Sequence, residues 1–359
     1  MFFNHVGKVS IKITLMYLLG YGTRPEAIKL FPLAIELQKR KIPFKVLFTG
    51  QHEDLANDKS IPMPKPDIVL KNVMKDGQSI NSLLSKIIVK SDKYFNNSNL
   101  KLIVQGDAES GIGLAISAFN NQIDVIHLEA GLRTNNINSP FPEEMNRRLL
   151  SQISNVHFCH SKKAVDNLKK ENITNNVYLV GNTVVDSVDY ILKNKTPSKN
   201  ILNLINRGAY FVATMHRREN RDTKFKRVWS ELENISSKKR IIYITHPSVK
   251  NIILDPSSNI DIIQPVNYVD MIYLLKHSGG VFSDSGGIQE EVTSLNKFML
   301  ICRDTTERKE IIDAGLGILV NYKIEKNLNF LYQKNIQHME PIYGQNVSKK
   351  IVDTLEKEI

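Results

Sequence analysis

The chain has 359 residues, of which 42% are hydrophobic and 24% charged, the composition of a soluble globular protein long enough for two domains. Its net charge of +11 comes from lysines spread over the whole chain, which argues against a nucleic-acid-binding arm or stripe. The cysteines, Cys159 and Cys302, have no metal or disulfide spacing, so we expect a reduced, cytoplasmic protein.

The first 22 residues are apolar in places. Lys8 and Lys12 interrupt them, and the apolar run 13–20 is too short to span a bilayer. We expect a loose extension followed by the first buried strand, with a poor signal peptide as the alternative.

A polar turn follows this strand, and the apolar spacing from residue 27 onward predicts a helix. The free N–H groups and the dipole of a helix N-terminus favour an anion, and Arg24 and Lys29 add positive charge there. The turn therefore indicates a phosphate site, although an ordinary α/β loop can also contain glycine and arginine.

The strand–loop–helix pattern then repeats. A strand at 44–48 leads to a polar loop at 51–54, a helix is expected at about 80–95, and Asp107 comes just after a strand at 100–105. Aspartate is a common N-cap residue, but the carboxyl ends of parallel strands meet at one edge, where ligands bind in open α/β sheets. We therefore predict a catalytic role for Asp107.

Residues 126–152 begin in a β-branched strand, expected at 122–128, and continue into a polar loop and a helix. Their charged and titratable side chains are His127, Glu129, Arg133, Glu143, Glu144, Arg147 and Arg148. Burying unpaired charges costs several kcal/mol, about 3–5 for a broken pair, so such a cluster indicates a site. The alternative is a capped surface helix, with Pro142 as its first residue and i,i+4 salt bridges along it.

After further strands at 155–161 and 175–182, residues 181–183 are expected to leave the first domain. A helix at 186–194 and a polar run at 195–200 form the predicted linker. The second half restarts the alternation, with His216 and His246 at strand ends. Its most informative segment is 279–295, where a strand, paired glycines and a helix with two glutamates suit a phosphate and a ribose.

Eight motifs stand in order along the chain: GTRPEAIKL, TGQH, HLEAGLRT, SPFPEEMNR, GNTVVD, HRREN, DSGGIQEE and RDTTER. Together they resemble the motif series of the non-hydrolysing UDP-N-acetylglucosamine 2-epimerases. The resemblance implies an α/β fold of glycosyltransferase-B-like architecture, with two Rossmann-like domains facing across a cleft and the C-terminal helix crossing back to the first. We place the N-terminal domain at 1–187, the UDP-binding domain at 188–345 and the C-terminal helix at 346–359.

The resemblance also implies an activity: reversible epimerisation at C2 of UDP-N-acetylglucosamine to UDP-N-acetylmannosamine, through elimination of UDP and a 2-acetamidoglucal. It implies no metal, no cofactor, no nucleic acid or membrane partner, and a homodimer. Carried over by motif position, the catalytic residues are Asp107, Glu129, Glu143 and His216. The residues that bind UDP and its phosphates are Arg24, Lys29, Ser285, Gly286, Gly287 and Glu291. A second, allosteric UDP-N-acetylglucosamine site would involve Gln51, Gln78, Glu144, Arg217 and His246.

The chain departs from the family pattern at several points. GDAES stands where the family usually has GDT followed by Ser or Thr, LNKFMLI replaces LGKP, and ERKE replaces ERPE; HRREN lacks the phenylalanine-glycine that commonly follows. These changes leave open a modified sugar, such as a UDP-2,3-diacetamido uronic acid, and a non-catalytic nucleotide-sugar sensor. The sequence is also compatible with a hydrolysing epimerase and with a glycosyltransferase on the same fold.

Overall fold

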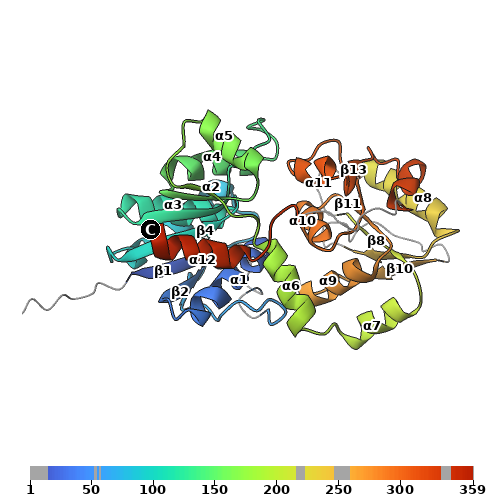
Figure 1. Ribbon diagram of the computed structural model, residues 1–359, viewed down its shortest axis with the longest axis horizontal. Helices are drawn as coiled ribbons and strands as arrows, with labels where there is room; N and C mark the ends of the chain where they lie inside the picture. The colour runs from blue at the N-terminus through green and yellow to red at the C-terminus, as the bar shows by residue number, and fades with distance from the viewer. Residues whose placement is uncertain are drawn as a thin grey trace, which may run out of the picture.

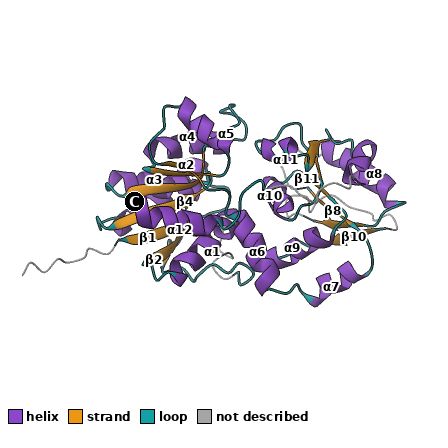
Figure 2. Ribbon diagram, in the orientation of Figure 1, coloured by secondary structure: helices purple, strands orange, loops and turns teal. Residues whose placement is uncertain are grey.

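The computed structural model of the protein describes residues 15–51, 55, 58–215, 223–245, 259–332 and 341–358. Within these ranges the chain forms two parallel β-sheets, each with helices packed against it (Figures 1 and 2). The two α/β units lie side by side, as predicted for two Rossmann-like domains. None of the helices in these ranges has the length and apolar character needed to cross a bilayer.

The first sheet has seven strands in the order β3-β2-β1-β4-β5-β6-β7, all parallel. The strands are β1 (Met16–Tyr21), β2 (Phe44–Phe48), β3 (Ile68–Val69), β4 (Leu100–Gln105), β5 (Asp124–Ala130), β6 (Val156–Cys159) and β7 (Val177–Leu179). Apolar side chains are buried on both faces of this sheet, as expected for parallel strands covered on both sides.

The helices of this domain follow the strands in alternation: α1 (Arg24–Lys39), α2 (Ile80–Ser91) with the 3₁₀ turn η2 (Asp92–Tyr94), α3 (Glu109–Asn120), α4 (Glu143–Ile153) and α5 (Lys162–Lys170). A capping box of Thr23 and Glu26 starts α1. The buried Glu26 carboxylate accepts hydrogen bonds from the N–H groups of Gly22 at 3.0 Å and Thr23 at 2.8 Å, and from the Ser110 hydroxyl. This carboxylate therefore joins the β1 turn to α3.

The second sheet has six parallel strands in the order β10-β9-β8-β11-β12-β13. The strands are β8 (Phe211–Thr214), β9 (Ile241–Ile244), β10 (Ile260–Ile263), β11 (Val281–Ser283), β12 (Met299–Ile301) and β13 (Gly317–Leu319). Its helices are α7 (Lys199–Asn206), α8 (Thr223–Ser236), α9 (Tyr268–His277), α10 (Gly286–Ser294), α11 (Lys309–Asp313) and the 3₁₀ segment η5 (Glu325–Tyr332).

Two helices connect the domains. Helix α6 (Val184–Asn194) packs against α1 on one side and α9 and α10 on the other, and α12 (Val347–Glu358) returns to pack on α1 (Figure 1). Arg40 Nη1 lies 2.6 Å from carboxylate oxygens of both Asp353 and Glu356, and Asp186 accepts the backbone N–H groups that open α12. The predicted return of the C-terminal helix to the first domain is therefore confirmed, whereas the exact domain boundaries stay a prediction.

The structure corrects several local predictions. The predicted polar linker 195–200 runs into helix α7, and β3, β10, α8 and α9 were not predicted as separate elements. Pro142 is the N-cap of α4 instead of its first residue. The N-cap of α3 is Ala108, so the interpretation of Asp107 as an N-cap residue is wrong.

The packing of α12 on the first domain predicts a stability effect. Ile351 is fully buried in the main core, so we expect Ile351→Ala to lower the free energy of unfolding by about 2–5 kcal/mol. Lys357→Ala, on the exposed side of the same helix, should change it by less than about 0.5 kcal/mol. Urea denaturation measures both; equal effects would contradict the packing of α12.

Candidate active site

A cavity of about 310 Å³ opens between the two domains. Arg24 and Lys29 reach it from α1, and Ser285, Gly287 and Glu291 reach it from α10 and the turn before it. Apolar side chains complete the lining, among them Val266, Tyr268, Met271 and Ile288. Five of the six predicted UDP-binding residues therefore line one cavity, and Gly286 lies between two of them in the chain.

Helix α10 begins at the cavity, and the first N–H groups of a helix have no partner within the helix itself. Ser285 is the N-cap, and its Oγ accepts the Ile288 N–H at 3.4 Å. A Cβ on Gly286 would lie 2.7 Å from Arg308 Nη1, whereas a Cβ on Gly287 would meet nothing closer than the Ser285 hydroxyl at 4.0 Å. The lack of a side chain at Gly286 thus lets the Arg308 guanidinium approach the start of α10. An anion bound there would be favoured by the helix dipole.

Four charges of alternating sign lie together at the domain interface, and we call them the charge ring: Lys29, Glu129, Arg308 and Glu290. Lys29 and Glu290 are buried and line the cavity, and the side chains of Glu129 and Arg308 are 7% and 12% exposed. Lys29 Nζ pairs with the Glu129 carboxylate and lies 2.8 Å from Glu290. Arg308 Nε lies 2.7 Å from Glu290, and its Nη2 is 3.5 Å from Glu129. Lys29 and Glu129 belong to the first domain and the other two to the second, so two of these pairs cross between domains.

The ring shifts the pKa values of Glu129 and Lys29 toward their charged forms. Burial opposes the charge on Glu129, but the nearby cations Lys29 and Arg308 outweigh it and lower the pKa of this carboxyl. Burial likewise opposes the charge on Lys29, and the carboxylates of Glu129 and Glu290 outweigh it and raise the Lys29 pKa. Glu129 therefore enters any reaction as a carboxylate.

The backbone of Glu129 is unusual. Its φ is +62°, and the β5–β6 register shifts at this point, between Leu128 and Ala130. The sequence predicted that the strand ends before Glu129, but β5 continues to Ala130 and Glu129 occupies a bulge within it. Gly131, with φ +83°, follows, and a Cβ there would lie 2.2 Å from the Ala164 carbonyl oxygen. The bulge turns Glu129 toward Lys29, at the cost of an uncommon backbone conformation.

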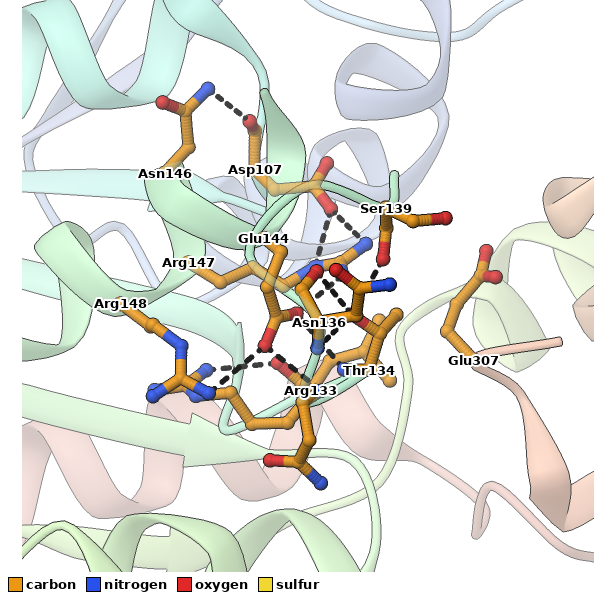
Figure 3. Close-up of polar contacts among 12 residues, drawn as sticks. Asp107, Arg133, Thr134, Asn136, Ser139, Glu144, Asn146, Arg147, Arg148 and Glu307 are labelled. Carbon is orange, nitrogen blue, oxygen red and sulfur yellow. Dashed lines mark hydrogen bonds and ion pairs between the residues drawn. The ribbon is translucent and has the colours of Figure 1, made fainter. Parts of the chain in front are cut away.

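A second ionic cluster lies on the first domain, around the start of α4 (Figure 3). Arg147 Nη2 lies 2.6 Å from Asp107 Oδ2, and Nε donates to the same oxygen at 2.7 Å. The Asn146 side chain donates to the Asp107 carbonyl at 2.9 Å. Arg147 therefore orients Asp107 and supplies its counter-charge.

Glu144 holds the loop before α4 in place. Its side chain is fully buried, pairs with Arg147 at 3.1 Å and Arg148 at 3.3 Å, and accepts the N–H groups of Thr134 and Asn135 (Figure 3). The helical salt bridges of the alternative interpretation thus exist, at i,i+3 and i,i+4. The Arg147 bridge is buried and connects to Asp107, whereas the Arg148 side chain is 38% exposed.

Glu143, next along α4, has a different environment. It is half-buried, and its Oε2 is a buried atom without a hydrogen-bond partner among the described residues. Burial, followed by the charges of Asp107 and Glu109, raises the Glu143 pKa despite the opposing charge of Arg147. Asp107 and Glu143 are therefore close enough to influence each other, while only Asp107 has a paired cation in the structure.

His127 is a structural residue of β5. It is fully buried, with Nε2 2.7 Å from the Gly106 carbonyl, and burial together with the charges of Arg133 and Arg147 lowers its pKa to about 4. A neutral imidazole at this position supports the turn that carries Asp107.

The remaining predicted residues occupy varied surroundings. Gln78 donates to the Val73 carbonyl at 3.1 Å and accepts from Lys86 at 2.8 Å, and Gln51 donates to Glu109 at 3.4 Å. Burial and the neighbouring Glu290 raise the pKa of Glu291 to about 8. Outside the described residues lie His216, Arg217 and His246.

Sequence reasoning gave no role to three residues that organise this region: Arg147, Glu290 and Arg308. Arg308 ends the RDTTER motif and Glu290 directly precedes Glu291, so both stand within motifs of the family. The pairing of Lys29 with Glu129, 100 residues away, carries no local sequence signal.

Comparison with known proteins agrees with this geometry. A family model described as UDP-N-acetylglucosamine 2-epimerase matches residues 35–356. The chain belongs to the UDP-N-acetylglucosamine 2-epimerase family. It is 35% identical to the UDP-N-acetylglucosamine 2-epimerase of Salmonella borreze, over 93% of this chain and 96% of the relative. The Bacillus subtilis enzyme of the same name is 33% identical, over 93% of each chain.

Solved structures of this family have the same fold. The UDP-GlcNAc 2-epimerase from Neisseria meningitidis bound to UDP-GlcNAc superposes with a TM-score of 0.84 at 33% identity, over 96% of this chain and 100% of that one. The Methanocaldococcus jannaschii epimerase in complex with UDP-GlcNAc and UDP gives 0.83 at 32% identity, over 95% and 99%. The two-domain epimerase architecture is thus confirmed for this family member.

The charge ring leads to a prediction for the free energy of unfolding when one of its side chains is replaced. Arg308→Met leaves the buried carboxylates Glu129 and Glu290 without one of their cations, so we expect the free energy of unfolding to fall by about 3–5 kcal/mol. Arg207→Ala removes an exposed ion pair with Asp261 in the second domain and should cost at most about 1 kcal/mol. Denaturant titration of both variants tests this, and similar small losses would contradict a coupled buried ring.

His127 predicts a pH dependence of stability. Between pH 6.5 and about 4 the unfolded chain binds a proton at this histidine and the folded chain does not, so the free energy of unfolding falls as the pH falls. His127→Asn removes this difference, and the slope of stability against pH should decrease by about 1.4 kcal/mol per unit within that window. Urea titrations at several pH values measure the slope; an unchanged slope would mean that the folded state protonates His127.

Proposed function

We propose that the protein interconverts UDP-N-acetylglucosamine and UDP-N-acetylmannosamine without hydrolysis, by eliminating UDP and adding it back. The observation that carries the proposal is that a cavity and a set of carboxylates lie together at the domain interface. A nucleotide-sized cavity with a helix start and cations lies beside the ionised Glu129, and Asp107 and Glu143 lie on the same edge of the first sheet.

The cavity suits the UDP portion of the substrate. The first N–H groups of α10 and the Arg24 side chain would receive the diphosphate, and the apolar residues from α9 would pack on the uracil. Glu291 would bind the ribose hydroxyls. With its pKa near 8 in the structure, this carboxyl can donate as well as accept a hydrogen bond.

The chemistry requires elimination, because the C2 hydrogen of the sugar is not adjacent to a carbonyl and is too weakly acidic for simple removal. As the C1–O bond breaks, positive charge develops on the ring and a carboxylate can take the C2 proton. The products are 2-acetamidoglucal and UDP, and UDP carries the electron pair of the broken bond. Re-addition forms the C1–O bond again and delivers a proton to the opposite face of C2.

The charged residues would divide these tasks. Arg24, Lys29 and Arg308 would stabilise the negative charge that develops on the departing UDP. Glu129, held ionised by the ring, would stabilise the developing positive charge on the sugar, while Asp107 and Glu143 would exchange protons with C2. We assign His216 to the pyrophosphate on motif position alone.

The allosteric second site and the homodimer stay predictions. Of the residues assigned to that site, Glu144 is fully buried and engaged by two arginines and two backbone N–H groups. It would therefore contribute by shaping the loop at 134–135 and not by direct contact with a ligand. Gln51 offers a buried carbonyl oxygen with no partner among the described residues.

A proton NMR time course with UDP-N-acetylglucosamine in deuterated water tests the proposed activity. We expect UDP-N-acetylmannosamine to accumulate with deuterium at C2, because the proton passes through groups that exchange with solvent. Glu129→Gln should lower kcat by a factor of about 10²–10⁴, as expected for loss of a charged catalytic group, while UDP binding in the cavity persists. Free N-acetylmannosamine with stoichiometric UDP would indicate hydrolysis instead, and binding without turnover would indicate a sensor.

A further inference from the structure

Gln105, the last residue of β4, makes a direct contact with one carboxylate of the proposed reaction. Its side chain is buried, and Gln105 Nε2 donates a hydrogen bond to Glu129 Oε2 on the neighbouring strand. Because an ionised carboxylate only accepts hydrogen bonds, the nitrogen of the amide must face Glu129. Asp107 follows two residues later in the chain, so residues 105–107 carry one carboxylate and hold the other.

The strand register explains how Gln105 reaches Glu129. In the pairing of β4 with β5, Gln105 stands opposite Leu128, the residue before the bulge. The Gly106 N–H donates to the Leu128 carbonyl at 3.1 Å, and the Gly106 carbonyl oxygen lies 2.7 Å from His127 Nε2. The chain that carries Gln105 is therefore bonded to β5 on both sides of Leu128, which gives its side chain a fixed base.

The two oxygens of the Glu129 carboxylate have different partners. Oε2 is held by Gln105 Nε2 and by Lys29 Nζ, both from the first domain. Lys29 is shared with Glu290, 2.8 Å away, and the contact of Glu129 Oε1 with Arg308 Nη2, from the second domain, is longer at 3.5 Å. The Gln105 amide therefore orients Glu129 from within the first domain. Since the amide is neutral, it adds no positive charge that would offset the charge of the carboxylate.

A small cavity adjoins this contact. It has a volume of about 10 Å³, and Gln105, Glu129, Asn182 and Thr183 are among the residues that line it. A cavity of this size holds one water molecule at most, so bulk solvent does not hydrate the Glu129 carboxylate from this side. The Gln105 amide thus supplies a hydrogen bond that water would otherwise have to supply.

We propose that Gln105 is a positioning residue for the reaction, which holds the Glu129 carboxylate at a fixed place relative to Asp107. The inference rests on the proposed function, in which Glu129 stabilises the positive charge that develops on the sugar. The amide orients Oε2, and Oε1 is the oxygen left to face the sugar. Electrostatic stabilisation requires the charge to be in place before the transition state forms, so a misplaced Glu129 lowers the rate even when the substrate binds normally.

Gln105→Met tests the inference, because methionine has nearly the length and shape of glutamine but no N–H donor. We expect kcat to fall by a factor of about 10–100, in the range caused by misplacement of a catalytic group, while the Kd for UDP changes by less than about twofold. Gln105→Asn keeps the amide on a side chain shorter by one methylene, and it should lower kcat similarly. Gln38→Met, at the exposed end of α1, is the matched control and should leave kcat unchanged.

A double-mutant cycle separates positioning of Glu129 from a general effect on the fold. If Gln105 acts through Glu129, adding Gln105→Met to Glu129→Gln should lower kcat by less than about a further twofold, because the positioned group has already lost its charge. Urea titration checks that each variant is folded, and Gln105→Asn replaces Gln105→Met in the cycle if the latter is not.

Two results would overturn the inference: an equal loss of kcat in the wild-type and Glu129→Gln backgrounds, or a normal kcat in both Gln105 variants. Absence of epimerisation by the wild-type protein would instead refute the proposed function, so the two failures are distinguishable.

Discussion

The arrangement of this protein depends on the burial of four charges between its two domains. Each domain contributes one cation and one anion to the charge ring, and isolating any of them from water would cost several kcal/mol. Lys29 in the first domain needs Glu290 from the second, and Arg308 in the second needs Glu129 from the first. The ring therefore favours close contact of the domains in one relative position, at the edge of the nucleotide-sized cavity.

Local backbone features follow from that requirement. Glu129 reaches Lys29 only because β5 bulges there with a positive φ, and the close approach of Ala164 then demands glycine at 131. Glycine is also required at 286, in the second domain, because the Arg308 side chain occupies the space that a Cβ would need. The glycines of two separate motifs thus serve the same ionic contact, in addition to shaping turns.

Much of this was predictable from the sequence, for physical reasons. Parallel strands buried on both faces produce continuous apolar runs, and their carboxyl ends share an edge, so the grouping of Asp107 with Glu143 could be anticipated. The two-residue strand β3 was missed because it is too short to show an apolar pattern, and helix α7 was missed because it begins inside the polar run 195–200. Long-range pairing could not be predicted either, because Arg308 and Glu290 form their ion pairs with the first domain only when the two domains are in contact. Glu144 was assigned to a second ligand site from its motif position, and this assignment stays a prediction; in the structure its buried carboxylate anchors the loop at 134–135.

The return of α12 to the first domain bears on how the protein is made. Its buried residues Val347, Ile351 and Leu355 belong to the same core as α1, although the second domain separates the two helices in the chain. Nearly the whole polypeptide must leave the ribosome before α12 can pack on α1. During synthesis the apolar surface that α12 later covers therefore stays exposed. The core of the first domain is completed only after the second domain has been translated.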